Sequence, residues 1–383
     1  MNNNNRSKTI VIFYSYYAPH VGGLEKYTYS LCKALTSKGH KVILITALFD
    51  NKLKPYEECP EATIYRFPIE KNAGNRYPIF KKSNLSKVFS ELSKINIDLA
   101  IIQARFYLLT LWAAKYTKKN NIPSICIDHG NAHLTVQNKL LDSMGAVYEH
   151  FLTGQVKKYI SNFYAVSNAS LKWLEHFGIK GKGVLYNSID KSEIGSLKKY
   201  IKKPKDDTVI TFAGRMIEDK GVLHLVKAFN RLCDKFDNIK LNLIGNGPAL
   251  NKVRELSYEN GNIHIFGRVE NSEVMKILGS SNIFVNPSRA EGMPTSILES
   301  GAMQCAVVAT PVGGTTEIIP DENYGIFCEV NDNSIYEKLE VLIQNKKEID
   351  KLGKNLQKRI LDKFTWDKVA DKIINIADEL SVK

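Results

Sequence analysis

The strongest constraint on the fold is an alternation of short apolar segments with amphipathic segments of helix length, which runs along the whole chain. In the first half, TIVIFYS leads through a glycine turn into the amphipathic GLEKYTYSLCKALTSKG, and KVILITAL follows. In the second half, TVITFAG, IKLNLIG and NIHIFG precede helices that we predict over 221–235, 248–258 and 271–279. This alternation is typical of parallel, doubly wound α/β sheets.

The alternation starts twice, and the polar segment KKYIKKPKDD (198–207) separates the two series. A chain of 383 residues is expected to form two domains of about 150–200 residues each. We therefore predict an N-terminal Rossmann-like domain over 1–195, completed by a C-terminal helix over 366–383, and a second Rossmann-like domain over 196–365. In such sheets, ligands bind outside the carboxyl ends of the strands, so the turns that follow the strands are the candidate sites.

Basic residues are concentrated in the first half of the chain. Residues 1–200 contain 28 Lys and Arg against 14 Asp and Glu, whereas the rest contains 25 against 26. This asymmetry indicates an anionic partner for the first half, such as an acidic lipid, a phosphorylated acceptor or a nucleic acid. A generally lysine-rich composition would explain the net charge of +13 but not the difference between the halves.

Cysteine usage and hydropathy indicate a cytoplasmic protein without a membrane-spanning helix. The six cysteines are scattered, with no C-x-x-C and no close Cys/His spacing, which is typical of reduced thiols and argues against a zinc site. No apolar run reaches the length of a transmembrane helix. The start, MNNNNRSK, leads directly into an apolar strand and lacks the features of a signal peptide.

Three turns carry candidate ligand-binding residues. Gly22 and Gly23 precede the first helix, where bare backbone N–H groups can approach an anion, although G-x-G-x-x-G is missing and a plain turn is an equal reading. In AGRMIEDKG, Arg215 and Lys220 form a possible clamp for a diphosphate, with solvated side chains as the alternative. The turn IGNGPAL adds the backbone of Gly245 at the same sheet edge.

The segment EGMPTSILE places Glu291 in a loop and Glu299 one to two turns into the following helix. Pro294 favours the first helical turn, so the N–H groups near Thr295 would face a phosphate. No histidine or third acid joins the two glutamates, which makes them poor metal ligands. Carboxylates suit the vicinal hydroxyls of a sugar or ribose.

Together these motifs resemble the retaining GT-B glycosyltransferases of the family-4 type. EGMPTSILE matches the E-x7-E motif of that family, and GGLE, NSID, GRMIEDKG, IGNGP and PVGGTTEII occur in the family's order and spacing over nearly the whole chain. The resemblance implies two Rossmann-like domains that face each other across a cleft. At two positions that are usually glycine and proline in the family, this chain has Gln304 and Ala306.

The resemblance also implies roles for individual residues. Arg215 and Lys220 would bind the diphosphate of a nucleotide-sugar donor, Glu291 its sugar and Glu299 its ribose. The backbone of Met293, Pro294 and Thr295 would face the donor, the base would lie near Val269 in FGRV, and Gly22 and Gly23 would close over the phosphates or the acceptor. His129, in IDHGN, resembles a histidine near the reacting sugar, although a lone histidine is more often structural. We assign catalytic roles to Glu291, His129, Arg215 and Lys220.

The predicted function is transfer of a sugar, with retention, from a UDP-sugar such as UDP-GlcNAc or a UDP-hexose to a lipid-linked or glycan acceptor. No metal or other cofactor is expected, because the two cations and helix N-termini would stabilise the leaving diphosphate. A nucleotide-sugar 2-epimerase of the same architecture stays an alternative. So does a nucleic-acid-binding protein, although the basic half lacks a reader motif and no nucleic acid is expected as a partner.

The basic, amphipathic stretch 71–94 suggests where an acceptor would be met. It mixes lysines with Tyr77, Ile79, Phe80, Val88 and Phe89, which suits an anionic membrane surface. A surface loop followed by an ordinary surface helix is the alternative. The stretch leads us to expect a peripheral enzyme on the inner face of the plasma membrane.

Overall fold

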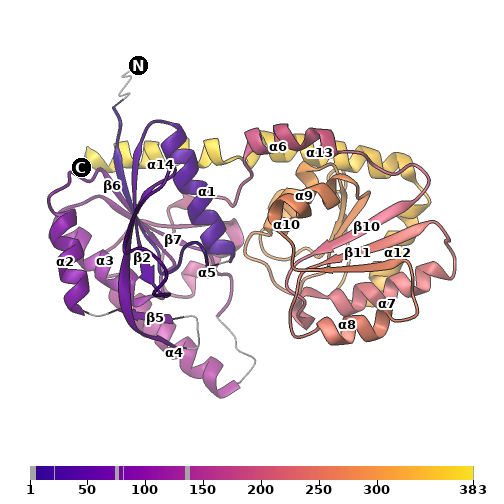
Figure 1. Cartoon of the computed structure of the whole chain (residues 1–383), viewed down its shortest axis with the longest axis horizontal. Coiled ribbons are helices and arrows are strands. Elements are labelled where there is room, and N and C mark those ends of the chain that lie inside the picture. The colour runs from indigo at the N-terminus through magenta and orange to yellow at the C-terminus, as the bar shows by residue number, and fades with distance from the viewer. Residues whose placement is uncertain (1–5, 21, 74–76, 81, 134–138, 383) are drawn as a thin grey trace. The chain divides into compact units, whose positions relative to one another are not determined.

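The computed structural model describes residues 6–20, 22–73, 77–80, 82–133 and 139–382, and the chain forms two compact units (Figure 1). Residues 1–186 with 366–383 form the first unit and residues 187–365 the second. The division falls before the predicted boundary at 195, because the start of the linking segment bonds to the second unit. Asn187 Nδ2 donates to the carbonyl of Met293 (2.7 Å), and the Ile189 amide donates to the carbonyl of Phe364 (2.9 Å).

The first unit is built on a sheet with the strand order β3-β4-β2-β1-β6-β7-β8-β9, and β5 pairs with β4. β3 and β5 run antiparallel to β4, and the other pairs are parallel. The strands are β1 (Thr9–Phe13), β2 (Lys41–Leu48), β3 (Tyr56–Glu58), β4 (Thr63–Ala73), β5 (Tyr77–Phe80), β6 (Leu99–Gln103), β7 (Ser124–Asp128), β8 (Phe163–Ala165) and β9 (Gly183–Val184). The helices are α1 (Gly23–Ser37), α2 (Lys82–Leu92), α3 (Leu108–Lys119), α4 (Lys139–Val156), α5 (Asn168–Glu175) and α14 (Trp366–Ser381).

The C-terminal helix α14 belongs to the first unit, where it lies beside α1 (Figure 1). Its apolar residues recur at helical spacing, and Trp366, Val369 and Ile373 are buried. The ring of Tyr27 on α1 meets Trp366 edge-on at 4.9 Å between centroids. Burial of this apolar stripe is the reason that the last helix packs on the first unit.

The second unit has a parallel sheet with the order β12-β11-β10-β13-β14-β15. The strands are β10 (Thr208–Ala213), β11 (Ile239–Ile244), β12 (Ile263–Gly267), β13 (Ile283–Asn286), β14 (Ala306–Ala309) and β15 (Ile326–Phe327). The helices are α6 (Lys191–Leu197), α7 (Val222–Cys233), α8 (Leu250–Ser257), α9 (Asn271–Gly279), α10 (Thr295–Ala302), α11 (Thr315–Ile318), α12 (Asp332–Ile343) and α13 (Lys346–Lys363), with short 3-10 turns at Lys198–Tyr200 and Glu218–Lys220.

The strand order of the second unit creates a switch point beside β10. From β10 the chain moves outward through β11 and β12, and it then returns to place β13 on the other side of β10. The strands are apolar on both faces, as parallel strands covered by helices must be, and Ile210, Phe212 and Val285 are fully or almost fully buried. The predicted doubly wound α/β architecture is thus confirmed, and its crevice is expected at the carboxyl ends of β10 and β13.

Within the described residues of the amphipathic stretch 71–94, 71–73 form the end of β4, 77–80 form β5 and 82–92 form α2. Phe80 and Val88 are buried in the core of the first unit, and Phe89 packs against the same core. The apolar side of this stretch is therefore engaged inside the unit. Lys81 and the side chains of Tyr77, Lys82 and Lys87 lie outside the described residues.

The cysteines are free thiols, and Cys32, Cys126, Cys305 and Cys328 are buried. In the described part of the chain, the helices are either too short or too polar to cross a bilayer.

Candidate active site

Two of the predicted site residues form an ion pair at the switch point of the second unit. Lys220 follows β10 and Glu291 follows β13, and Lys220 Nζ lies 2.5 Å from Glu291 Oε1. Asn286 Nδ2, at the end of β13, donates to the same oxygen at 3.3 Å. The Lys220 and Glu291 side chains are only 21% and 11% exposed, so the pair is largely shielded from water. A cation and a carboxylate thus meet where a parallel sheet binds its ligand.

The turn after β10 lies against the turn after β13 because Gly221 has no side chain. Gly221 has a φ of +67°, and a Cβ there would lie 2.2 Å from the carbonyl oxygen of Pro287. The Arg289 amide also donates to the carbonyl of Asp219 (2.8 Å). These contacts hold Lys220 beside Glu291, whereas Arg215, at the start of the same turn, is exposed to solvent.

Glycine backbone lines the neighbouring turn after β11. Gly245 has a φ of +133°, and a Cβ there would lie 1.8 Å from the carbonyl oxygen of Gly214. A Cβ at Gly247 would likewise lie 2.4 Å from the carbonyl oxygen of Met216. Any side chain at either position would push the turns after β10 and β11 apart.

Helix α10 presents its N-terminus at the same edge. It begins at Thr295, after Pro294, and no side chain caps its first turn. The segment before it is fixed, because Met293 and Pro294 are buried and Asn187 Nδ2 holds the Met293 carbonyl. The first N–H groups, which no side chain caps, and the helix dipole favour an anion at this point. Glu299 lies on the second turn of α10 and is half-buried, and Val269 follows β12 and is also half-buried.

In the first unit, Gly22 and Gly23 stand at the N-terminus of α1, as predicted, but a carboxylate occupies this turn. A Cβ on Gly22 would lie 2.3 Å from Glu25 Oε2, whereas a Cβ on Gly23 would meet nothing within 4 Å. Glu25 is buried, and its Oε1 lies 2.7 Å from His20 Nδ1. Sequence reasoning did not single out Glu25 and His20, although an acid in the first turn of a helix is a recognisable signal.

His129 follows β7 in the first unit, and its ring is held from two sides. His129 Nε2 lies 2.7 Å from Gln103 Oε1, and the ring of Tyr27 meets it edge-on at 4.6 Å. Burial lowers the pKa of His129 to about 3. The imidazole is therefore neutral at pH 7, with Nε2–H donating to Gln103 and Nδ1 left as an acceptor. Such a group can bind a hydroxyl but cannot serve as a cationic clamp.

A buried ionic network lies behind His129. Arg105, which follows β6, is 3.4 Å from Asp128 Oδ1 and 3.2 Å from Glu149 Oε2, and all three side chains are at most 2% exposed. Burial raises the pKa of Asp128, and Arg105 opposes that shift. Sequence reasoning missed this network, because its members come from distant segments; the isolated Arg105 in an apolar context was the one available signal.

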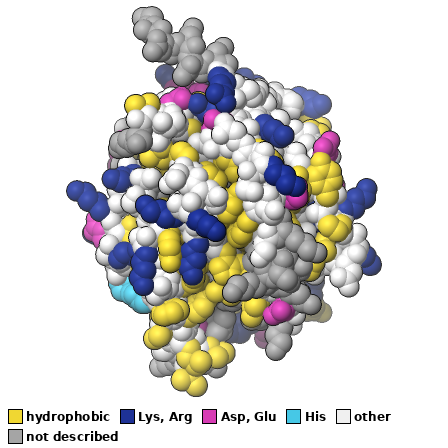
Figure 2. All heavy atoms as spheres, turned by 90° about the vertical axis from the view of Figure 1, so that its left-hand side faces the viewer, with side chains coloured by type: hydrophobic (Ala, Val, Ile, Leu, Met, Phe, Trp, Pro, Cys, Tyr) yellow, Lys and Arg dark blue, Asp and Glu magenta, His cyan; other side chains and the backbone are white. Residues whose placement is uncertain are grey.

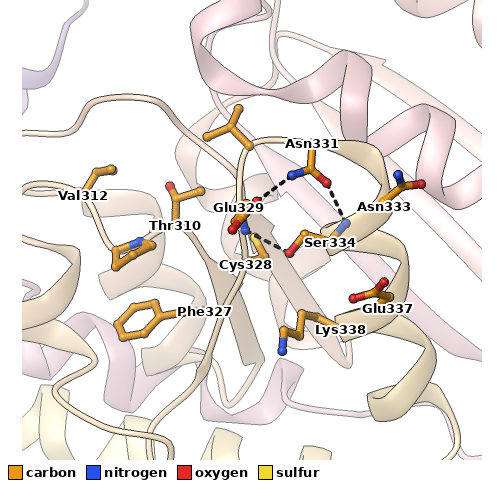
Figure 3. Close-up of a pocket in the computed structure, with 12 residues that line it drawn as sticks. Thr310, Val312, Phe327, Cys328, Glu329, Asn331, Asn333, Ser334, Glu337 and Lys338 are labelled. Carbon is orange, nitrogen blue, oxygen red and sulfur yellow. Dashed lines mark hydrogen bonds between the residues drawn. The ribbon is translucent and has the colours of Figure 1, made fainter.

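A pocket of about 780 Å³ lies at the outer end of the second sheet, between the segment after β14 and the start of α12 (Figure 3). Asn331 Nδ2 donates to Glu329 Oε2 (3.0 Å), and the Ser334 amide donates to Asn331 Oδ1 (2.7 Å). None of the predicted site residues lines this pocket. Thr310, Pro311 and Val312 form part of its lining, and the Gly314 amide, two residues further on, donates to the carbonyl of Gly292, next to Glu291 (2.9 Å).

The two halves of the chain match two consecutive family models. Residues 21–193 match the model described as Glycosyltransferase Family 4, and residues 194–359 match Glycosyl transferases group 1. Together the two models span the predicted site in both units.

Relatives of similar length are glycosyltransferases. An uncharacterized glycosyltransferase of Methanocaldococcus jannaschii is 28% identical over 98% of this chain and 99% of its own length. One component of the human phosphatidylinositol N-acetylglucosaminyltransferase is 24% identical over 99% of this chain and 77% of its own length. The capsular polysaccharide biosynthesis glycosyltransferase CapM of Staphylococcus aureus is 31% identical over 44% of this chain and 45% of its own length.

Solved structures share the fold over nearly the whole chain. The sucrose-phosphate synthase of Thermosynechococcus elongatus has a TM-score of 0.77 at 17% identity, covering 98% of this chain and 99% of that chain. Anabaena HepE in complex with UDP and glucose has a TM-score of 0.70 at 14% identity, covering 96% of this chain and 98% of that chain. At these identities the likeness establishes the fold.

Proposed function

Because the chain belongs to the GT-B glycosyltransferases, with a family-4 N-terminal half and a group 1 C-terminal half, we propose that it uses a UDP-sugar to build a cell-surface polysaccharide or glycolipid. The sugar, GlcNAc or a hexose, passes to a lipid-linked or glycan acceptor with retention of its anomeric configuration. The observation that carries the proposal is the Lys220–Glu291 pair at the switch point, beside the uncapped N-terminus of α10.

The proposed chemistry depends on charge that develops on the departing diphosphate. Lys220 and Arg215 supply two cations, and the first N–H groups of α10 supply a preorganised partial positive charge. In the free protein Glu291 neutralises Lys220. When a donor binds, its sugar hydroxyls hydrogen-bond to Glu291 in place of Lys220. Lys220 then pairs with the phosphates. These groups do the work that a metal ion does in other transferases, so we propose transfer without a metal.

Retention is proposed to follow a front-face route through an oxocarbenium-like transition state. Glu291 is bound to Lys220 and Asn286, which supports a role in holding the sugar rather than in attacking it. Glu299 is proposed to hold the ribose. His129 is neutral and offers Nδ1 as an acceptor for a hydroxyl of the reacting sugar or the acceptor.

A donor-hydrolysis screen tests the reaction. The purified chain is offered sugar nucleotides one at a time, with and without EDTA, and free nucleotide diphosphate is measured. We expect release from a UDP-sugar, undiminished by EDTA, and a loss of about 100-fold or more in Lys220→Ala and Glu291→Ala. Lys276→Ala is the matched control, because Lys276 is an exposed cation paired with Glu273 on α9. Wild-type rates in both site variants would contradict the proposal, and interconversion of sugar nucleotides without acceptor would point to an epimerase.

We propose that the acceptor is met at an anionic membrane surface on the cytoplasmic side. Met144, Val147 and Phe151 share one face of α4 and are 62%, 70% and 64% exposed. Lys and Arg are spread over the face of the first unit in Figure 2 and clearly exceed Asp and Glu there. An apolar helical face on a basic unit suits insertion at the headgroups of an anionic bilayer.

Vesicle flotation tests the membrane proposal. We expect the chain to float with vesicles that contain phosphatidylglycerol and less with phosphatidylcholine alone, and the triple change Met144→Ser, Val147→Ser, Phe151→Ser to abolish flotation. Val341→Ser is the control, because Val341 is 60% exposed on α12 of the second unit. Charge reversal at Lys81, Lys82 and Lys87 should weaken flotation as well. Equal flotation of wild type and the triple variant would overturn the role of α4.

A further inference from the structure

Three histidines from separate segments of the first unit come together at its surface. His133 lies in the segment after β7, His150 on α4 and His176 at the end of α5. Their ring centroids are 5.5 Å apart for His133–His150, 5.2 Å for His133–His176 and 4.9 Å for His150–His176. One ring nitrogen of each lies within 4.8 Å of the corresponding atoms of the other two.

The spacing of two of these nitrogens is close to that of metal ligands. Nε2 of His150 and Nε2 of His176 are 3.1 Å apart. Two imidazoles on a tetrahedral zinc ion, each about 2.0–2.1 Å from the metal, have nitrogens roughly 3.4 Å apart. A small rotation of the exposed His150 and His176 side chains would therefore bring their nitrogens to the spacing of zinc ligands.

His133 carries the hydrogen bond that orients a metal-binding histidine. Its Nδ1 lies 3.2 Å from Glu149 Oε2, and Glu149 is held by Arg105 at 3.2 Å from the same oxygen. Because Glu149 is a buried carboxylate, Nδ1–H donates to it and the lone pair of His133 is on Nε2. A carboxylate behind a histidine ligand fixes the tautomer in this way and raises the basicity of the ring.

The other two rings are also prepared to act as ligands. The indole of Trp173 stacks on His176, with centroids 4.7 Å apart and planes at 9°, which restricts the orientation of that ring. The Nε2 atoms of His150 and His176 are 3.1 Å apart, close enough for one ring to donate to the other, so at least one of these two atoms carries a lone pair.

We propose that His133, His150 and His176 form a binding site for a first-row transition-metal ion of the Zn²⁺, Co²⁺, Ni²⁺ or Cu²⁺ type. Three imidazoles fill three positions and leave a further position open to water or another ligand. Nitrogen ligands select these ions over Mg²⁺ and Ca²⁺, which prefer oxygen. The site is separate from the sugar-transfer reaction proposed above, and the inference does not depend on that reaction.

A bound ion would cross-link three segments of the first unit, namely the loop after β7, α4 and the end of α5. It would also be connected through Glu149 and Arg105 to Asp128, the residue before His129. We therefore expect metal binding to raise the thermal stability of the first unit.

Metal titration of the untagged, EDTA-treated full-length chain tests the site. Calorimetry with ZnCl₂ should show one ion per chain, CoCl₂ should give the visible absorption of tetrahedral Co²⁺ bound to nitrogen, and MgCl₂ should give neither. Zn²⁺ should also raise the melting temperature. His150→Ala and His176→Ala should each lose at least tenfold in affinity, and His264→Ala, at an exposed histidine of the second unit, should lose nothing. Circular dichroism of each variant checks its fold.

Glu149→Gln tests the positioning role separately. Loss of the carboxylate behind a histidine ligand typically costs about 10–100-fold in metal affinity. The variant should therefore bind more weakly than wild type and retain the cobalt spectrum at saturation. The site would be overturned by no binding at micromolar metal, by equal affinity in wild type and His176→Ala, or by a cobalt spectrum dominated by thiolate charge transfer.

Discussion

Glu291 and Glu299 are eight positions apart on one segment, yet the structure gives them different surroundings. Glu291 is tied to Lys220 and Asn286 on neighbouring turns, whereas Glu299 lies on the second turn of α10. If the first holds the sugar of the donor and the second its ribose, removal of each carboxylate should affect different ligands.

We expect Glu299→Gln to lower the affinity for UDP by about tenfold or more, because a charged acceptor for the ribose hydroxyls contributes roughly 1.5–3 kcal/mol. Glu291→Gln should leave UDP affinity unchanged or higher, because it frees Lys220 for the phosphates, while it lowers the affinity for the intact UDP-sugar. Calorimetric titration of both ligands into both variants measures this. An equal loss of UDP binding in the two variants would contradict separate roles.

His129 gives a prediction about pH dependence. Its pKa in the folded chain is about 3, below the ordinary 6.5, so the unfolded chain binds the proton more readily. The stability associated with the neutral ring is complete above pH 6.5 and is lost as the pH falls toward 3. Between pH 7.5 and 5.5, wild type should lose about 1.4 kcal/mol more than His129→Gln. Urea unfolding at the two pH values measures the difference, and parallel losses would refute the assignment.

At the scale of elements, the link between α10 and β14 carries a residue in a conformation that favours glycine. Gln304 has a φ of +61°, and its Nε2 donates to Gln357 Oε1 on α13 at 2.8 Å. The family usually has glycine at this position. Gln304 therefore replaces glycine where the backbone must adopt the left-handed conformation. The side chain of Gln304 faces α13, away from the predicted site residues of the turns.

A comparison of two variants isolates the backbone effect. Gln304→Gly and Gln304→Ala both lose the bond to Gln357, but only alanine keeps a Cβ in the left-handed region. We expect the glycine variant to be about 1 kcal/mol more stable than the alanine variant. Chemical denaturation followed by circular dichroism measures the difference. If the alanine variant is the more stable one, the left-handed conformation carries no cost here.

At the scale of the whole molecule, the chain passes from the first unit into the second and then returns to the first as helix α14. The helix α14 therefore stabilises a unit whose other elements end near residue 186. Trp366, which is 7% exposed and lies against Tyr27, is the largest side chain in that contact.

Trp366→Ala should destabilise the first unit by about 3–5 kcal/mol, because it leaves a cavity between α14 and α1. Hydrogen exchange measured by mass spectrometry should show faster exchange in α1 and α14, with α7 and α10 unchanged. Val382→Ala is the control, because Val382 is 88% exposed at the end of the chain. Faster exchange throughout both units would mean that they unfold together.

The sequence by itself determined the alternation of strands and helices, the two-fold repetition of the α/β pattern and the turns that carry the candidate site. These features depend on local periodicity and turn chemistry, which a chain expresses over a few residues. It also placed the predicted helices over 221–235, 248–258 and 271–279 to within a few residues of α7, α8 and α9.

Only the tertiary structure decided which distant side chains meet. The Lys220–Glu291 pair exists because β13 returns to the side of β10, and the contact of Glu25 with Gly22 depends on how its side chain folds back over the turn. The Arg105 network and the three-histidine cluster join residues of three segments each. Strand order and helix packing are set by non-local burial, which no spacing along the chain records.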